Sequence, residues 1–276
     1  MERPEFDSFD VECEREAIGS SVKSIRAILE TLYAKPGLVT AYAKFTNVPP
    51  DVAEKKFRKG CRQLYDAATR LLIVTVLGLA HHTAAGTFAW FFTISCQTAR
   101  IELVAPTASA RVYGAQGYKE PDGSWSPEEV PAGRNPIWPS VVLEVGLSES
   151  RRKLRADAAW WLTNSAGQVN VVILIFINRA VAERVFESLV LQQPPTSLDL
   201  RSGRRQCQLE TRQSITVTRP PGGVNQPITT SPDTLPFTIT FEELMCRSPL
   251  PPEADMAIPI AALEGIAKNV WNAQGL

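Results

Sequence analysis

The sequence predicts a mixed α/β fold, and three stretches carry that prediction. Residues 169–178, VNVVILIFIN, form an apolar run rich in β-branched residues, which is typical of a central strand buried on both faces. Residues 141–145, VVLEV, indicate a second strand, and the segment opened by SES at 148–150 has the apolar spacing of a helix between the two. Helices that alternate with strands in this way predict a mixed central sheet flanked by helices.

Two helices are expected before this region. Residues 12–34 place apolar side chains near 3.6-residue spacing, and a Pro-Gly pair ends the run. A second helix is expected after a Pro-Pro pair, with Asp51 as its N-cap, and continues to about residue 72. The two helices would make residues 1–70 a helical N-terminal extension and leave residues 71–276 as the main domain.

The second of these helices would carry a basic face. That face has two readings, a solvated helix surface or a patch that binds phosphate. Its members are Lys55, Lys56, Arg58, Lys59 and Arg62.

The sequence patterns identify some of the remaining elements clearly and leave one of them open. Residues 83–98 stay open between helix and strand, because their Ala, Phe and Trp side chains fit either period. Residues 219–236 are rich in Pro, Gly and Thr and indicate a loop, while residues 258–271 indicate a closing helix. Further strands are expected at 101–105, 109–118, 184–192, 213–220 and 237–244.

The composition excludes a global electrostatic attraction to nucleic acid or to a membrane, because 29 Lys and Arg residues balance 29 Asp and Glu residues. Any nucleic-acid binding would depend on local patches. The five cysteines lie far apart with no C-x-x-C pair, which indicates reduced thiols rather than a disulfide scaffold or a zinc site. The acidic N-terminus also lacks the pattern of a signal peptide, so we expect an intracellular protein, cytoplasmic or nuclear.

Residues 71–98 contain no charged side chain and raise the question of a membrane span. Their centre, GLAHHTAAGT, holds two histidines and two threonines, which are poorly placed at a bilayer midplane. Two buried elements joined by a turn that contains the histidines fit better, so no membrane partner is expected. The sequence leaves the oligomeric state open.

Glu144 is the most conspicuous residue of the predicted core, because it stands in the middle of the apolar strand VVLEV. A carboxylate in such a position costs several kcal/mol to bury unless something pairs with it. It could lie on a solvated face, pair with a basic side chain or hold a metal ion. Period-2 alternation places Val142, Glu144 and Gly146 on one face of the strand and Val141, Leu143 and Val145 on the other.

Asp122 is the second acidic residue with a distinctive setting. It follows Pro121 in the turn-rich sequence KEPDGS, just before the strand that carries Glu144. A turn-forming role is open to Asp122 alone. Two carboxylates that converge from adjacent strands would instead form a hard-oxygen site suited to Mg²⁺ or Mn²⁺.

This order of motifs resembles a known superfamily. A Pro-Asp pair at 121–122, an apolar strand with a glutamate, a helix and a second apolar strand form the core of the PD-(D/E)XK, or restriction-endonuclease-like, superfamily. The pattern PDGSW, SVVLEVGLSES, LRADAAWWL and VNVVILIFINR is most similar to uncharacterised fungal proteins with such a core. The resemblance covers roughly residues 75 to 190 and implies a helix at 83–98.

The resemblance also implies the roles of individual residues. Asp122 and Glu144 would bind Mg²⁺ or Mn²⁺, which polarises the scissile phosphate and activates a water molecule. The superfamily's lysine, two residues after the glutamate, is Gly146 here. Some members carry the lysine on the following helix, which makes Lys153 the candidate substitute, although Lys153 could also be solvated beside its neighbouring arginines. The acidic partner that the family often adds to a histidine in its first core helix is absent from His81-His82.

Two functions follow from this reading. The first is Mg²⁺-dependent phosphodiester hydrolysis of nucleic acid, with Asp122 and Glu144 as metal ligands and Lys153 as the catalytic cation. The second is a catalytically inactive protein of nuclease fold that acts as a binding or scaffold module. Gly146 favours the second function, and the intact Asp122 and Glu144 pair favours the first.

Overall fold

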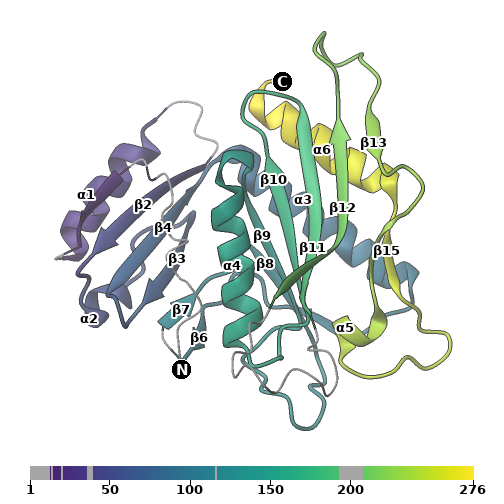
Figure 1. Ribbon diagram of the computed structural model, residues 1–276, viewed down its shortest axis with the longest axis horizontal. Helices are drawn as coiled ribbons and strands as arrows, with labels where there is room; N and C mark the ends of the chain where they lie inside the picture. Colours follow the sequence, from purple (N-terminus) through teal and green to yellow (C-terminus); the bar gives the residue numbers. More distant parts are fainter. Residues whose placement is uncertain (1–12, 14, 20, 36–39, 116, 193–207) are drawn as a thin grey trace, which may run out of the picture.

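The computed structural model describes residues 13, 15–19, 21–35, 40–115, 117–192 and 208–276. Within these residues, the chain builds two large β-sheets and one small one, with helices packed against the large sheets (Figure 1). Of the described cysteines, Cys61, Cys96 and Cys246 are free thiols. The fifth, Cys207, lies outside the described residues.

The first sheet is formed by the N-terminal part of the chain. Helix α1 (Val22–Tyr33) packs on it through Ile25, Leu29 and Leu32, the apolar stripe that its periodicity predicts. Ser21 caps this helix by accepting a hydrogen bond from the backbone N–H of Ser24. The strand order is β1 (Arg15–Ile18), β2 (Thr40–Thr46), β4 (Leu71–Leu77), β3 (Cys61–Asp66), β7 (Gly117–Lys119) and β6 (Val112–Gly114).

The prediction of a helical N-terminal extension is wrong. The helix expected from Asp51 is only the four-residue α2 (Pro50–Ala53), and the segment after it contains strand β3. β3 is hydrogen-bonded to β4 on one side and to β7 on the other, so pairing across the sheet overrides the local helical pattern. The expected boundary at residue 70 falls inside the β3–β4 hairpin, and the first sheet continues to Lys119.

The second sheet contains the predicted core strands. β9 (Val141–Leu147) and β10 (Val171–Ile177) are parallel neighbours, with Glu144 opposite Leu174. A 3₁₀ turn (Ser148–Ser150) and helix α4 (Arg151–Asn164) connect them, as the SES motif predicts. The full strand order is β13 (Thr229–Ser231), β12 (Leu209–Thr218), β11 (Glu183–Leu191), β10, β9, β8 (Gly123–Pro127) and β5 (Val104–Pro106).

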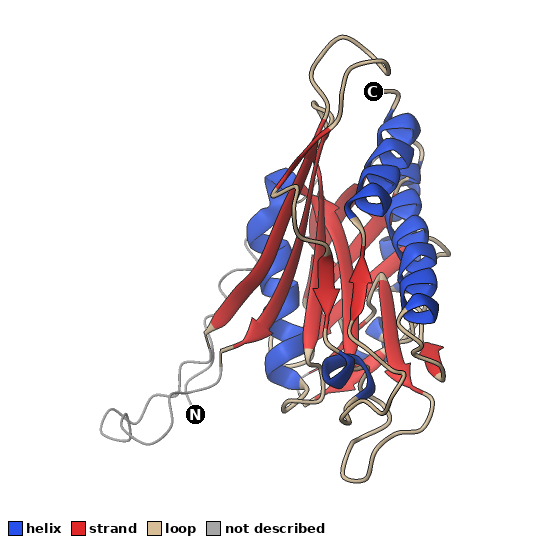
Figure 2. Ribbon diagram, turned by 90° about the vertical axis from the view of Figure 1, so that its right-hand side faces the viewer, coloured by secondary structure: helices blue, strands red, loops and turns tan. Residues whose placement is uncertain are grey.

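Helices cover both faces of this second sheet (Figure 2). α3 (Leu79–Thr98) and α6 (Ile260–Gln274) lie against the face that presents Val141, Leu143 and Val145. α4 lies against the opposite face, where Val142 packs with Leu154 and Trp161. The predicted alternation on β9 therefore places its side chains in two apolar layers, one on each face of the sheet. Residues 83–98, which the pattern left open between helix and strand, form part of helix α3.

The charge-free stretch at residues 71–98 divides into strand β4 and helix α3. None of the helices in the described parts of the chain is long and apolar enough to cross a membrane.

The C-terminal region departs from its prediction in detail. Residues 237–244 are not one strand but β14 (Phe237–Ile239) followed by helix α5 (Phe241–Met245). Thr240 interrupts the strand because its side chain caps α5, with Glu243 completing the capping box. β14 pairs with β15 (Met256–Ile258), and the Pro/Gly-rich loop at 219–236 contains the short strand β13.

Gly146 marks the closest approach between β9 and α4. A Cβ atom on this residue would lie 2.1 Å from Cδ1 of Leu154 and 3.0 Å from the hydroxyl of Tyr42. Both neighbours are buried and held in the core, so the space for a side chain is already filled. A side chain at this position requires Leu154 to repack or α4 to shift away from the sheet.

Gly146→Ala should therefore destabilise the fold by overpacking, by about 1–3 kcal/mol. Gly86→Ala is the matched control, because Gly86 is an exposed position of α3 with open space around its Cα. That control should stabilise the chain by roughly 0.5–1 kcal/mol through helix propensity. Urea unfolding midpoints measure both changes, and equal midpoints for Gly146→Ala and wild type would contradict the packing argument.

Candidate functional site

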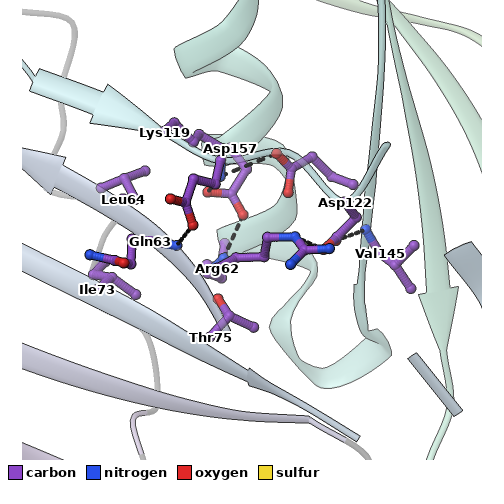
Figure 3. A pocket seen from close by; sticks show the side chains of 12 residues that line it. Arg62, Gln63, Leu64, Ile73, Thr75, Lys119, Asp122, Val145 and Asp157 are labelled. Carbon is purple, nitrogen blue, oxygen red and sulfur yellow. Dashed lines mark hydrogen bonds and ion pairs between the residues drawn. The ribbon is translucent and has the colours of Figure 1, made fainter. Parts of the chain in front are cut away.

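Charged side chains meet in a small cavity between the two large sheets (Figure 3). The cavity encloses about 10 Å³, close to the minimum that a single water molecule occupies. Strands β3 and β7 of the first sheet form one wall, and β9 and α4 form the other. Its charged lining residues are Arg62, Lys119, Glu120, Asp122, Glu144, Lys153 and Asp157.

Asp122 enters the cavity from the turn between β7 and β8. Its backbone N–H donates to the carbonyl of Leu143 at 3.1 Å, and its Oδ2 accepts from the N–H of Val145 at 2.8 Å. Oδ1 lies 2.9 Å from Nε2 of His81 and 3.4 Å from Nε of Arg62. Burial opposes ionisation, but His81, Arg62 and the Val145 N–H together lower the pKa of Asp122 to about 2. Asp122 is therefore a carboxylate at neutral pH.

One oxygen of Asp122 keeps unused accepting capacity. Oδ1 is buried and has no hydrogen-bond partner among the described residues, and neither has Nε2 of His81. The short distance between these atoms is therefore an electrostatic contact without hydrogen-bond alignment. His81 is held from its other side, where Nδ1 lies 3.2 Å from the Thr40 hydroxyl.

Glu144 is paired, which answers the question that its apolar strand raises. Its Oε1 accepts a hydrogen bond from Nε1 of Trp161 at 2.5 Å and lies 3.2 Å from Nζ of Lys119. The reading of a solvated face is wrong, because only 5% of Glu144 is exposed. Burial raises the pKa of Glu144 to about 7, and the charge of Lys119 offsets this only in part.

Asp157 links two lysines beneath Glu144. Its Oδ1 lies 2.8 Å from Nζ of Lys119, and its Oδ2 accepts from Nζ of Lys153 at 2.6 Å. Burial opposes the ionisation of Asp157, but the two ammonium groups lower its pKa below the ordinary value. Burial disfavours the charge on Lys153, but Asp157 and Glu144 raise its pKa overall. The reading of a solvated Lys153 is therefore wrong, since the side chain is buried in the cavity wall.

Three residues that the sequence analysis did not select complete the site. Asp157 stands four positions after Lys153, the spacing of an ion pair on a helix, and this signal was available in the sequence. Lys119 carries no such signal, because it reaches Glu144 from another sheet. Arg62 was assigned to the basic face of a helix that does not form, and on β3 it points at Asp122.

Glu120 lies beside the cavity but belongs to the first sheet. Arg111 donates to its Oε1 at 3.0 Å, and the backbone N–H of Gln63 donates to its Oε2 at 3.2 Å. Arg111 also stacks over the ring of Tyr118, 3.9 Å from its centroid. These contacts neutralise Glu120 and give it a structural explanation that needs no ligand.

The capacity of the site for a metal ion rests on two carboxylates. In the described parts of the chain, no group of three or more His, Cys, Asp and Glu side chains is arranged to hold a metal. Asp122 stands next to the Gly123–Leu143 pair of the β8–β9 ladder, which brings it beside Glu144. Trp161 and Lys119 both contact Oε1 of Glu144, and Oδ1 of Asp122 faces His81 and Arg62 without a hydrogen bond.

Cysteine chemistry finds no support in the buried thiols. Burial raises the pKa of Cys61 to about 11 and that of Cys96 to about 12. At neutral pH both groups are protonated and are poor nucleophiles.

Comparison with known proteins adds little to this geometry. No protein-family model matches the chain, and no curated protein sequence matches it. One similar solved structure is a protein from Anabaena variabilis described as a candidate nuclease of DUF820, 13% identical over 45% of this chain and 73% of that one. The TM-score of this match is 0.29.

Two substitutions separate the contributions of the acidic groups to stability. Asp157→Asn removes the shared partner of Lys119 and Lys153, and should cost on the order of 3–5 kcal/mol. Glu144→Gln keeps the shape and leaves Lys119 paired with Asp157, so it should cost less than about 1 kcal/mol at pH 8. Urea unfolding measures both. A larger loss for Glu144→Gln than for Asp157→Asn would show that Glu144 is the main partner of Lys119.

The raised pKa of Glu144 makes stability depend on pH. The folded state holds this proton more tightly than the unfolded state, whose value is near 4.5, so stability should rise as pH falls from about 7 toward 4.5. Between pH 8 and 5, wild type should gain on the order of 2 kcal/mol relative to Glu144→Gln. Other titrating groups contribute equally to both proteins, so their effect on stability cancels in the comparison. One such group is His82, because burial lowers its pKa. Parallel pH profiles of the two proteins would contradict the shift.

Proposed function

We propose that this chain hydrolyses phosphodiester bonds of nucleic acid with the help of Mg²⁺ or Mn²⁺. The observation that carries the proposal is that Asp122 and Glu144 line one cavity, with the ammonium of Lys119 beside Glu144. Burial and fixed contacts hold all three side chains in place. The sequence resembles PD-(D/E)XK nucleases, and this proposal assigns the roles of their motif to Asp122, Glu144 and Lys119.

The donor set fits a hard divalent cation. Mg²⁺ is usually bound by one or two carboxylates together with water and substrate phosphate, and Asp122 and Glu144 are two carboxylates that line one cavity. When bound, such an ion polarises the phosphate and lowers the pKa of an attacking water molecule. The absence of a third acidic ligand in the described residues predicts that the ion binds weakly alone and more tightly with a phosphodiester.

We assign to Lys119 the role of the lysine that the superfamily's motif has and this chain lacks. Its Nζ stands 3.2 Å from Glu144, where a positive charge would stabilise charge that develops on a phosphate. Gly146 has no side chain, and Leu154 fills the space beside it. Lys153 is a positioning residue in this scheme, since it reaches the site through Asp157, which holds Lys119.

Glu144 must lose its proton before it binds a cation. With a pKa of about 7, a substantial fraction of Glu144 is protonated at neutral pH. Binding of Mg²⁺ would therefore release a proton, and the affinity for the ion would rise as pH increases through 7.

A second candidate function is a nuclease-like fold kept for binding without catalysis. The observation that favours it is charge balance, since Lys119, Lys153 and Arg62 already offset the three carboxylates. A divalent cation would then add charge to a neutral site. The three carboxylates that these cations offset are Asp122, Glu144 and Asp157.

Cleavage of single-stranded and duplex DNA and RNA with Mg²⁺ or Mn²⁺ at pH 8 tests the proposal. Asp122→Asn, Glu144→Gln and Lys119→Met should each lower the rate by about 10²-fold or more. Asp233→Asn, an exposed aspartate in the Pro/Gly-rich loop, is the matched control and should keep the wild-type rate.

A thermal shift measured in parallel separates the two candidate functions. Mn²⁺ at about ten times its dissociation constant should add roughly 1.4 kcal/mol to the stability of wild type and nothing to Glu144→Gln. Absence of both cleavage and a Mn²⁺ shift at pH 8 would overturn the hydrolase proposal in favour of the binding module.

A further inference from the structure

A strongly basic loop lies next to the candidate site. Residues 54–60 connect α2 to β3 and contain four cations in the sequence EKKFRKG; we name this segment the basic loop. The cations are Lys55, Lys56, Arg58 and Lys59. The sequence analysis left them open between a solvated helix face and a phosphate-binding patch, and the structure removes the helix.

Three hydrogen bonds from two neighbouring side chains fix the backbone of the basic loop. Arg26 of α1 donates to the carbonyl of Phe57 at 3.0 Å and to that of Lys56 at 3.1 Å. Gln63 donates to the carbonyl of Lys55 at 3.2 Å. Because these hydrogen bonds hold the backbone of the loop, binding need not order it.

The basic loop borders a cavity of about 480 Å³, which is the size of a ligand cleft. Four cations and one carboxylate line it, and the carboxylate, Glu120, is already bonded to Arg111. The cavity shares Arg62, Gln63 and Glu120 with the smaller cavity that holds Asp122 and Glu144. The lining cations are Lys56, Arg58, Lys59 and Arg62.

Part of this positive charge has no internal partner. The ammonium of Lys59 forms no ion pair within the described residues, and that of Lys56 is 3.8 Å from Glu120 with 75% of its side chain exposed. Arg58 is bound to Glu30, and Arg62 lies 3.4 Å from Asp122. A surplus of cations around a concave surface, in a chain with no net charge, creates a local field that attracts polyanions.

We propose that the basic loop and its cavity bind the phosphate backbone of a nucleic-acid strand and lead it to Asp122 and Glu144. The inference deepens the proposed function and rests on it for the identity of the strand. A nucleic acid fits better than an acidic peptide, because the cavity shares walls with a site whose available groups suit phosphate and a divalent cation. The first sheet would then serve as the strand-binding surface.

Binding of a labelled single-stranded oligonucleotide, followed by fluorescence anisotropy in EDTA across a salt series, tests this inference on the full chain. Lys59→Glu should weaken binding about tenfold at low salt and reduce the slope of log affinity against log salt by about 1. Lys268→Glu on α6 makes the same charge change at an exposed position away from the cavity and should leave affinity and slope unchanged. Melting temperatures of both variants check that they fold.

Two results would overturn the inference. One is equal affinity of Lys59→Glu and Lys268→Glu for the oligonucleotide. The other is competition by poly-glutamate as strong as that by an unlabelled oligonucleotide of the same charge, which would identify an acidic protein as the partner.

The same variants distinguish this inference from the proposed function. Suppose that Lys59→Glu weakens salt-dependent binding and that the wild type shows neither cleavage nor a Mn²⁺ shift. The binding surface would then be supported, and the hydrolase proposal would be refuted. Cleavage that proceeds equally in Lys59→Glu and Lys268→Glu would retain the hydrolase and refute the binding surface.

Discussion

The ion-pair network centred on Lys119 holds the candidate site together. Lys119 ends a strand of the first sheet, yet its ammonium lies between Glu144 and Asp157 of the second sheet and its helix. Buried charges are tolerated only when each has close partners and hydrogen bonds, and here Lys153 and Trp161 complete the set. The two sheets are therefore joined by charges whose relative positions must be correct, which ties the geometry of the site to the packing of the whole molecule.

The same network explains how the site departs from the motif that the sequence resembles. At Gly146 the helix α4 packs so closely on β9 that a side chain would overlap Leu154. That close packing also brings Asp157 and Lys153 of α4 near Glu144, where they face Lys119. A lysine from a neighbouring sheet thus stands beside Glu144.

The first sheet consequently contributes to the site and does not form a separate extension. Arg62 on β3 reaches Asp122, and Lys119 on β7 reaches Glu144. The loop before β3 adds the basic side chains that border the neighbouring cavity. If the chain acts on nucleic acid, both the cation beside the reacting phosphate and the surface that binds the strand would come from this sheet.

The sequence by itself determined the strands β9 and β10 and the helices α4 and α6. Those features depend on periodicity and on burial within one segment, which local residues report directly. Only the tertiary structure decided that residues 61–66 form a strand, because their pairing partners lie in β4 and β7. It also decided that Lys119 is the partner of Glu144, because an ion pair between two sheets leaves no spacing in the sequence for a pattern to detect.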